Sequence, residues 1–278
     1  MKTSNSPGPV FVWAVTRCVC AIALMVLTAF TTEGQDKEPW HTKKCAVALT
    51  YDDALNVHLD NVVPLLDTLG FKGTFYLSAS FPGFSARVSD WISVSKRGHE
   101  LGNHTLFHPC EGSLPGREWV KPDYDLKKYT VGRMVDEIRM ANTLLQTLDG
   151  KTERTFAYPC GDMKAGDSSY VEKIRADFLG ARGVEGKMQK LDEIDVYDVG
   201  AYMVNGQSGD ELIRLVKEAM AKHALLVFLF HGVGGEHALN VSLDDHRKML
   251  YFLKDNEKDI WVAPMVEIAK YVRERGKS

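Results

Sequence analysis

Short apolar runs alternate with amphipathic segments along most of the chain. The runs are rich in β-branched and aromatic residues, and the segments between them repeat apolar positions at helical spacing, as at Leu59, Val62, Leu66 and Leu69. Capping signals at Ser208 and Ser242 mark the starts of two later helices. The pattern predicts strands at 46–51, 73–77, 99–102, 155–158, 224–230 and 260–263, with a helix after most of them.

This alternation of strand and helix is typical of α/β proteins with a parallel sheet. Several turns of it within residues 35–278 fit a distorted TIM-like (β/α) barrel. A doubly wound open sheet is the alternative. Since no Ser/Gly-rich linker, repeat or second apolar span divides this stretch, we expect a single domain.

Composition limits the classes of protein and partner. The 278 residues are 45% apolar and 26% charged, which is typical of a globular protein and excludes a disordered, collagen-like or coiled-coil chain. The formal net charge of −3 gives no electrostatic reason to bind nucleic acid.

The N-terminal segment differs from the rest. Residues 18–30 carry no charge, and this run is too short to span a bilayer. Small residues precede Gln35, where a signal peptidase would cleave. We therefore predict a signal peptide at 1–34 and a secreted or periplasmic protein that does not contact the membrane after cleavage. The alternative is an uncleaved membrane anchor at 11–30, interrupted only by Arg17.

Chemically capable residues follow four of the predicted strands. In parallel α/β folds the carboxyl ends of the strands meet at one face, where active sites lie. We therefore expect these residues to form one site. They are Asp52 and Asp53, His104 and His108, Cys160 and Asp162, and His231.

The residue types favour metal-assisted hydrolysis. Two neutral imidazoles and one carboxylate are the ligand set of a catalytic Zn²⁺ site, and Co²⁺ or another divalent ion also suits it. Adjacent carboxylates on a strand point to opposite sides, so one of Asp52 and Asp53 should bind the metal and the other should accept a proton. His231 is placed to protonate the leaving group.

From about Cys45 to Tyr271 the sequence resembles the polysaccharide deacetylase family, the NodB-homology carbohydrate esterases. Three stretches carry the resemblance: Thr-Tyr-Asp-Asp-Ala at 50–54, His-Thr-Leu-Phe-His at 104–108 and Leu-Phe-His at 229–231. The resemblance implies a distorted (β/α) barrel and a metal-dependent mechanism. It implies that Asp52 is the general base, that Asp53, His104 and His108 bind the metal, and that His231 is the general acid.

Two family motifs are altered. The third reads Phe-Ala-Tyr-Pro-Cys-Gly at 156–161, with Ala157 where many members have the arginine that pairs with the base. Either a nearby arginine such as Arg154 replaces it, or the base works without one. By resemblance, the backbone N–H of Cys160 still helps to hold the oxyanion. The aspartate that orients the acid histidine has two candidates, Asp195 and Asp198.

The resemblance implies a hydrolase that removes acetyl groups from an acetylated polysaccharide or oligosaccharide, either N-acetyl groups of an amino sugar or O-acetyl groups of a hemicellulose. The alternative, motivated by Ala157 and by the lack of a clear aspartate motif, is a catalytically impaired carbohydrate-binding barrel. Aromatic residues in the long loop 109–130 either stack on sugar rings or fasten the loop to the barrel. They are Trp119, Tyr124 and Tyr129.

The cysteines after position 34 allow one bridge. Cys110 lies two residues beyond His108, and Cys160 follows a central strand, so both should emerge on the face of the site. We predict a disulfide between Cys110 and Cys160, with Cys45 free and buried. The alternative is that the two thiols bind the metal.

Overall fold

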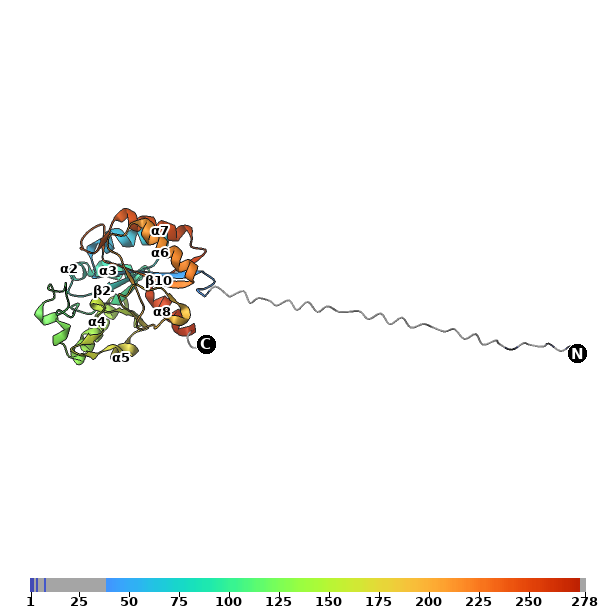
Figure 1. Ribbon diagram of the computed structural model, residues 1–278, viewed down its shortest axis with the longest axis horizontal. Helices are drawn as coiled ribbons and strands as arrows, with labels where there is room; N and C mark the ends of the chain where they lie inside the picture. Colours follow the sequence, from blue (N-terminus) through green and yellow to red (C-terminus); the bar gives the residue numbers. More distant parts are fainter. Residues whose placement is uncertain (3, 5–7, 9–38, 276–278) are drawn as a thin grey trace. The chain divides into compact units, whose positions relative to one another are not determined.

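The computed structural model describes residues 39–275 and the isolated positions 1, 2, 4 and 8 (Figure 1). Its contacts divide the chain into two units, Met1–Gln35 and Asp36–Ser278. The predicted signal peptide at 1–34 and the alternative anchor at 11–30 fall almost wholly outside the described residues and stay predictions. No helix in the described part of the chain is long and apolar enough to cross a membrane.

The second unit is built on a nine-stranded sheet. Its strands follow one another in the order β7-β4-β3-β2-β1-β10-β8, with β13 also beside β1 and β9 beside β10. The pairs are parallel except for the edge pair between β10 and β8. The strands are β1 (Cys45–Asp52), β2 (Thr74–Leu77), β3 (Glu100–Asn103), β4 (Thr155–Ala157), β7 (Gly180–Arg182), β8 (Gln189–Lys190), β9 (Tyr202–Met203), β10 (Ala224–Phe230) and β13 (Ile260–Val262).

The segment from Val199 to Met203 brings the two sides of this sheet together. Val199 forms a parallel bridge with Arg182 at the end of β7, and β9 pairs with β10 three residues later. The sheet is therefore curled into a distorted barrel and does not form a doubly wound open sheet. The predicted α/β barrel in one domain is confirmed.

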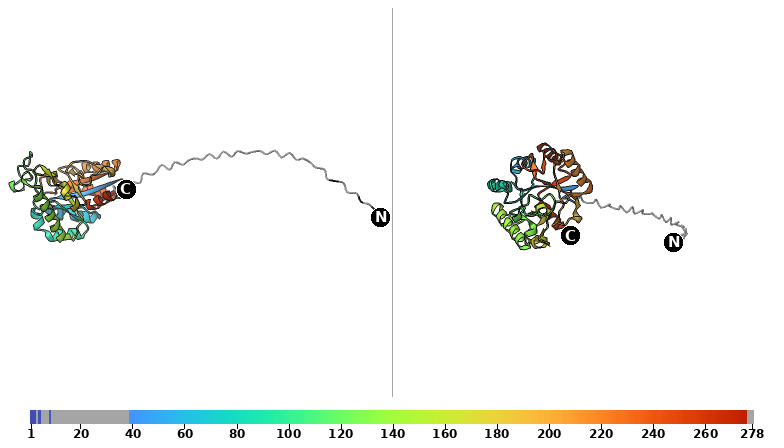
Figure 2. Two further views of the ribbon diagram at one scale, coloured as in Figure 1. Left: turned by 90° about the horizontal axis from the view of Figure 1, so that it is seen from below. Right: turned by 60° about the vertical axis from the view of Figure 1, so that its left-hand side comes forward.

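Helices surround the curled sheet (Figure 2). They are α1 (Val63–Leu69), α2 (Pro82–Ser85), α3 (Val88–Lys96), α4 (Val131–Asp149), α5 (Val171–Ile174), α6 (Gly209–Lys222), α7 (Leu243–Asp255) and α8 (Met265–Arg275). The predicted caps are confirmed, since the side chains of Ser208 and Ser242 accept hydrogen bonds from the N–H groups of Glu211 and Asp245. These caps fix where α6 and α7 begin.

Side chains of β1 alternate between two apolar clusters. Val47 and Leu49 pack with α1, α6 and α7, whereas Ala46 and Ala48 pack with residues of β2, β4, β10 and α8. The second cluster fills the inside of the curled sheet. Asp52, at the end of the same alternation as Ala46, therefore points towards the inside of the barrel.

Several small elements were not predicted. A π-helix, η1 (His58–Val62), precedes α1, and β7 was missed. Short 3₁₀ helices and two-residue strands occupy the loops. They are η2 (Pro122–Tyr124), η3 (Leu126–Lys128), η4 (Pro159–Gly161), η5 (Arg175–Asp177), η6 (Leu191–Glu193), β5 (Lys164–Ala165), β6 (Ser168–Ser169), β11 (Gly232–Val233) and β12 (Asn240–Val241).

Candidate active site

The chain turns sharply after β1, and this turn brings two carboxylates to one pocket. Asp53 has a φ of 81° and Ala54 a φ of 55°, both in the left-handed region. The N–H of Asp53 donates to the carbonyl of Tyr76 on β2. Because this turn breaks the alternation of the strand, Asp52 and Asp53 line the same pocket and do not point to opposite sides.

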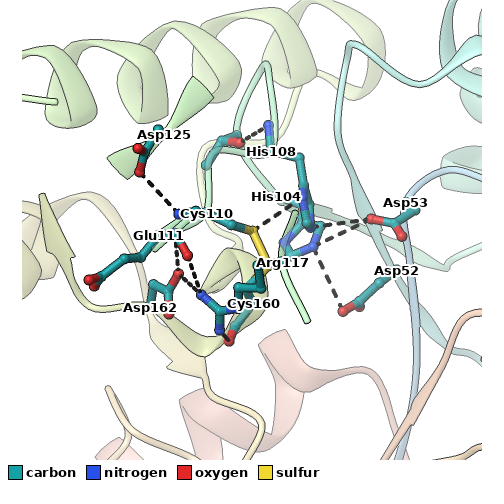
Figure 3. The surroundings of a disulfide bond; sticks show 12 residues. Asp52, Asp53, His104, His108, Cys110, Glu111, Arg117, Asp125, Cys160 and Asp162 are labelled. Atoms are coloured by element: carbon teal, nitrogen blue, oxygen red, sulfur yellow. Dashed lines mark hydrogen bonds and ion pairs between the residues drawn. A yellow bond between two sulfur atoms is a disulfide. The ribbon is translucent and has the colours of Figure 1, made fainter. Parts of the chain in front are cut away.

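The histidines after β3 face Asp53. The Nε2 atoms of His104 and His108 lie 3.7 and 3.6 Å from its Oδ1 atom (Figure 3). His104 Nδ1 donates to the carbonyl of Ala157 at 2.8 Å, which leaves a lone pair on Nε2. The side chain of Thr105 accepts from the N–H of His108 and holds the turn between the two rings.

Asp53, His104 and His108 fit a metal site. One ligand atom from each lies within 4.8 Å of the others, and Asp53 Oδ1 is buried without a hydrogen-bond partner. Burial lowers the pKa of each histidine to about 4, so both rings are neutral and able to bind a cation. A buried carboxylate oxygen without a donor, facing two neutral imidazoles, is the arrangement that a divalent ion satisfies.

A buried arginine pairs with Asp52. Arg182, the last residue of β7, is fully buried, and its Nη2 lies 2.6 Å from both carboxylate oxygens of Asp52. Burial alone would raise the pKa of Asp52, but the positive charge of Arg182 holds this pKa below its usual value. Asp52 is therefore ionised at neutral pH.

Arg182 lies on the strand next to Ala157, the position at which many family members have an arginine. In the pairing of β4 with β7, Ala157 is the register partner of Arg182. Residues paired in this way point to the same face of the sheet. The suggestion of Arg154 was wrong, because its guanidinium binds Asp149 and the carbonyl of Leu101.

Two histidines lie on the other side of Asp53. The Nε2 atoms of His231 and His237 are 3.8 and 4.0 Å from Asp53 Oδ2, and the two rings are stacked with their centroids 4.6 Å apart. Sequence reasoning missed His237, which follows a Gly-Gly turn and not a strand end. The Nε2 of the buried His58 lies 2.7 Å from the carbonyl of His231, which anchors the start of this loop.

The expected aspartate partner of His231 is absent from the described residues. Asp195 caps the N–H of Tyr197, and Asp198 lies 3.7 Å from Lys187. The Nδ1 of His231 is buried without a hydrogen-bond partner. The ring of His237 stacks on the ring of His231 but does not bind its Nδ1.

A disulfide joins Cys110 to Cys160, with the α-carbons 5.9 Å apart, and Cys45 is free and buried (Figure 3). This is the pairing that the strand-end positions predict. Cys110 Sγ lies 3.7 Å from His108 Nδ1. Since both sulfurs are used in the bridge, they are not thiolate ligands, and the bridge ties the loop after His108 to the turn at Cys160.

One pocket of about 780 Å³ is lined by Asp52, Asp53, His104, His108, Cys160, His231 and His237. This volume is within the range of ligand sites. Cys160, at the turn after β4, has a φ of 55° and lies in the pocket wall. The wall also contains apolar side chains from several loops. They include Phe81, Trp119, Val184, Met203 and Leu239.

A profile of the polysaccharide deacetylase family matches residues 41–176. Over these residues the chain belongs to this family. The matched region includes β1 with Asp52 and Asp53, the histidines after β3, and the turn at Cys160. The resemblance inferred from the motifs is therefore confirmed.

Solved structures of deacetylases share the fold. A polysaccharide deacetylase from Mycobacterium smegmatis superposes with a TM-score of 0.61 at 15% identity, covering 84% of this chain and 91% of that one. A family 4 acetyl xylan esterase from Clostridium thermocellum, solved with a cobalt ion, gives 0.52 at 15% identity, covering 81% and 90%.

A curated relative is much longer than this chain. A gellan lyase from a Bacillus species is 23% identical over 259 residues, which are 84% of this chain and 10% of the lyase. The chain thus spans about a tenth of that relative.

Replacing Arg182 tests its pairing with Asp52. Because breaking one side of a buried ion pair leaves an uncompensated charge, we expect Arg182→Ala to lower the free energy of unfolding by about 3–5 kcal/mol. Because Ala157 and Arg182 are register partners on the same face of the sheet, an arginine at position 157 should also reach Asp52. Adding Ala157→Arg should therefore restore part of the lost stability. Urea unfolding of the two variants measures both effects. A double variant no more stable than Arg182→Ala would contradict the claim that an arginine at position 157 can pair with Asp52.

Proposed function

We propose that this protein is a secreted, metal-dependent hydrolase that removes acetyl groups from an acetylated polysaccharide. The observation that supports this most strongly is the joint arrangement at the strand ends: a carboxylate paired with Arg182, and a second carboxylate that faces two histidines. This provides a proton acceptor and a set of metal ligands on one pocket wall.

Asp53, His104 and His108 would hold the metal. When bound, a divalent ion such as Zn²⁺ or Co²⁺ polarises the acetyl carbonyl and lowers the pKa of a water molecule. The hydrogen bond from His104 Nδ1 to Ala157 fixes the ring so that Nε2 stays directed at the carboxylates.

Asp52 is the group that accepts the proton of the attacking water. Its carboxylate is ionised because of Arg182, and its Oδ2 lies 3.8 Å from His104 Nε2, beside the proposed metal ligands. Arg182 acts through Asp52: it orients the carboxylate and balances its charge. The backbone N–H of Cys160, in the pocket wall, is the proposed donor to the oxyanion.

His231 is the proposed acid. Its Nε2 atom faces Oδ2 of Asp53, whereas the Nε2 atoms of His104 and His108 face Oδ1 of the same carboxylate. Burial lowers the pKa of His231 to about 3, so the ring is neutral in the free site. To act as an acid the ring must first take up a proton, and we propose that this is the proton that Asp52 removes from the attacking water. The resulting imidazolium then donates that proton to the leaving nitrogen or oxygen as its bond to the acetyl carbon breaks.

Removing His231 should slow substrates with poor leaving groups most. We expect His231→Ala to lower kcat by roughly 10²- to 10⁴-fold on an acetylated sugar, the usual contribution of a positioned acid. The loss on p-nitrophenyl acetate should be much smaller, because nitrophenolate leaves without protonation. Steady-state kinetics on both substrates measure the ratio, and an equal loss on both would contradict the assignment.

Export is supported by two features. The charge-free run at 18–30 is typical of a signal peptide, and the Cys110–Cys160 bridge is typical of proteins in oxidising compartments. N-terminal sequencing of the protein from a secreting host tests this. A start near Gln35 is expected, and an intact Met1 in the membrane fraction would favour the anchor.

The impaired-barrel alternative has lost one of its two motivations. Arg182 supplies the charge beside the base that Ala157 lacks, whereas no aspartate of the described residues binds Nδ1 of His231. The proposed function is tested by acetate release from chitin oligosaccharides, peptidoglycan and acetylated xylan. We expect the wild type to release acetate from at least one class of glycan. The rate of release by Asp52→Asn should be lower by about 10²-fold or more. No release from any of them would overturn the proposal.

A further inference from the structure

The ring of His231 is not held by a side chain at its second nitrogen. Among the described residues no hydrogen-bond partner reaches its buried Nδ1, and the ring that stacks on it, His237, comes from the same loop. A histidine that transfers a proton must be held close to its working position, because small displacements lower the rate strongly. The position of His231 therefore depends on how the backbone of its loop is fixed.

The π-helix η1 provides two side chains that contact this loop. His58, its first residue, lies with Nε2 2.7 Å from the carbonyl of His231. Asn61 Nδ2 donates to the carbonyl of Val233 at 2.8 Å. Because both contacts come from one short helix, they fix the start of the loop as a unit. π-Helical turns are rare and often occur at functional sites.

A later residue of the loop is fastened to the same region. Glu236 has a φ of 67°, and its carboxylate accepts from the side chain of Asn56 and from the N–H of Val57, both at 2.7 Å. Asn56 follows Asp53 by only three positions in the sequence. The loop that carries His231 is therefore tied to the chain directly after the turn that places the carboxylates.

His58 is suited to donate one hydrogen bond. It is fully buried, and burial lowers its pKa to about 4, so the ring is neutral and carries one proton. A carbonyl can only accept, so this proton is on Nε2, and Nδ1 is left buried without a partner. An apolar side chain would fill the same space without an unpaired nitrogen. The bond to His231 is therefore the feature that His58 adds.

We propose that His58 is a positioning residue that orients His231 through the backbone, with Asn61 and Glu236 supporting the same loop. The hydrogen bond from His58 fixes the carbonyl of His231, and with it the direction in which the ring leaves the chain towards Asp53. The inference rests on the proposed role of His231 as the acid. It accounts for how this acid is held without an aspartate at Nδ1.

His58→Phe tests this role, because it keeps a ring of similar size and removes the donor. We expect kcat on an acetylated sugar to fall by about tenfold or more, since a displaced acid loses part of its contribution. On p-nitrophenyl acetate kcat should change by less than about twofold, because nitrophenolate leaves without protonation. His58→Gln, whose amide can donate from a similar position, should recover most of the rate. Equal losses on the two substrates would overturn the proposal.

Two further comparisons separate positioning from general damage. His99→Phe is the matched control, since His99 is also fully buried and its Nδ1 accepts from the N–H of Gly73, just before β2. It should not change the ratio of the two rates. In the His231→Ala background, His58→Phe should cause no further loss on the sugar, because the residue that it positions is gone. Losses that multiply in the double variant would contradict the proposal.

Histidine NMR of the zinc-loaded protein tests the positioning without turnover. His231→Ala identifies the ring resonances of His231 by their disappearance. We expect these resonances to shift or broaden in His58→Phe and to stay in place in His99→Phe. If His58→Phe does not fold, Asn61→Leu removes the neighbouring bond and should have the same effect. His231 resonances that do not move in the folded variant would overturn the positioning.

The two proposals fail separately. His231 resonances that move in His58→Phe, with no acetate released by the wild type from any glycan, would overturn the hydrolase alone. Acetate release by the wild type, combined with unmoved His231 resonances in His58→Phe, would overturn the positioning alone.

Discussion

Asp53→Ala, His104→Ala and His108→Ala should each lose bound metal and activity together. Each change removes one of three ligands whose atoms lie within 4.8 Å of one another. Because a metal contributes several kcal/mol of charge stabilisation in the transition state, kcat/KM should fall by about 10³-fold or more. Elemental analysis of the purified variants and acetate release measure the two losses.

A histidine outside the pocket provides the control. His41 packs between Trp261 and Tyr271 and is exposed, so His41→Ala should keep its metal and its activity. Full metal content in purified His104→Ala would remove His104 from the site. Loss of metal in His41→Ala would show that the loss reflects damaged folding and not a missing ligand.

Asp52→Asn should separate proton transfer from metal binding. The amide keeps the shape of the side chain but cannot accept a proton, so we expect kcat to fall by roughly 10²- to 10⁴-fold. The metal should remain at one ion per chain, because Asp53 and the two histidines are unchanged. Elemental analysis and single-turnover acetate release test the two parts.

Asp210→Asn is a matched control for this change. Asp210 forms an exposed ion pair with Lys248 on the surface, so the same loss of one carboxylate should leave kcat unchanged. If Asp52→Asn lost its metal along with its turnover, Asp52 would be a ligand and not the base. If it kept full turnover, the proton would be accepted elsewhere.

The strand ends were the part of the site that the sequence could predict. Asp52 ends β1 and His231 follows β10, two buried strands with clear apolar runs, whereas His104 follows the short strand β3. Parallel topology brings the three residues together. The turn at Asp53 was not foreseen, because its left-handed backbone is set by tertiary contacts such as the bond to Tyr76. The in-and-out alternation of side chains along β1 therefore wrongly predicted that Asp53 points away from Asp52.

Arg182 was missed for a different reason. Strand β7 has only three residues, Gly180–Arg182, too few for a period to be visible. Its closeness to Asp52 depends on which residue of β4 it pairs with, and that register is a property of the assembled sheet. A search near Ala157 along the chain could find only Arg154, which binds Asp149 instead.

The most direct test of the account is acetate release by the enzyme after chelation and stepwise return of metal. We expect chelated protein to release acetate at least about 10³-fold more slowly than the loaded enzyme. Adding Zn²⁺ or Co²⁺ should restore the rate, with the titration ending at one ion per chain, and His104→Ala should not recover. Undiminished acetate release from protein shown by elemental analysis to be free of metal would contradict the account.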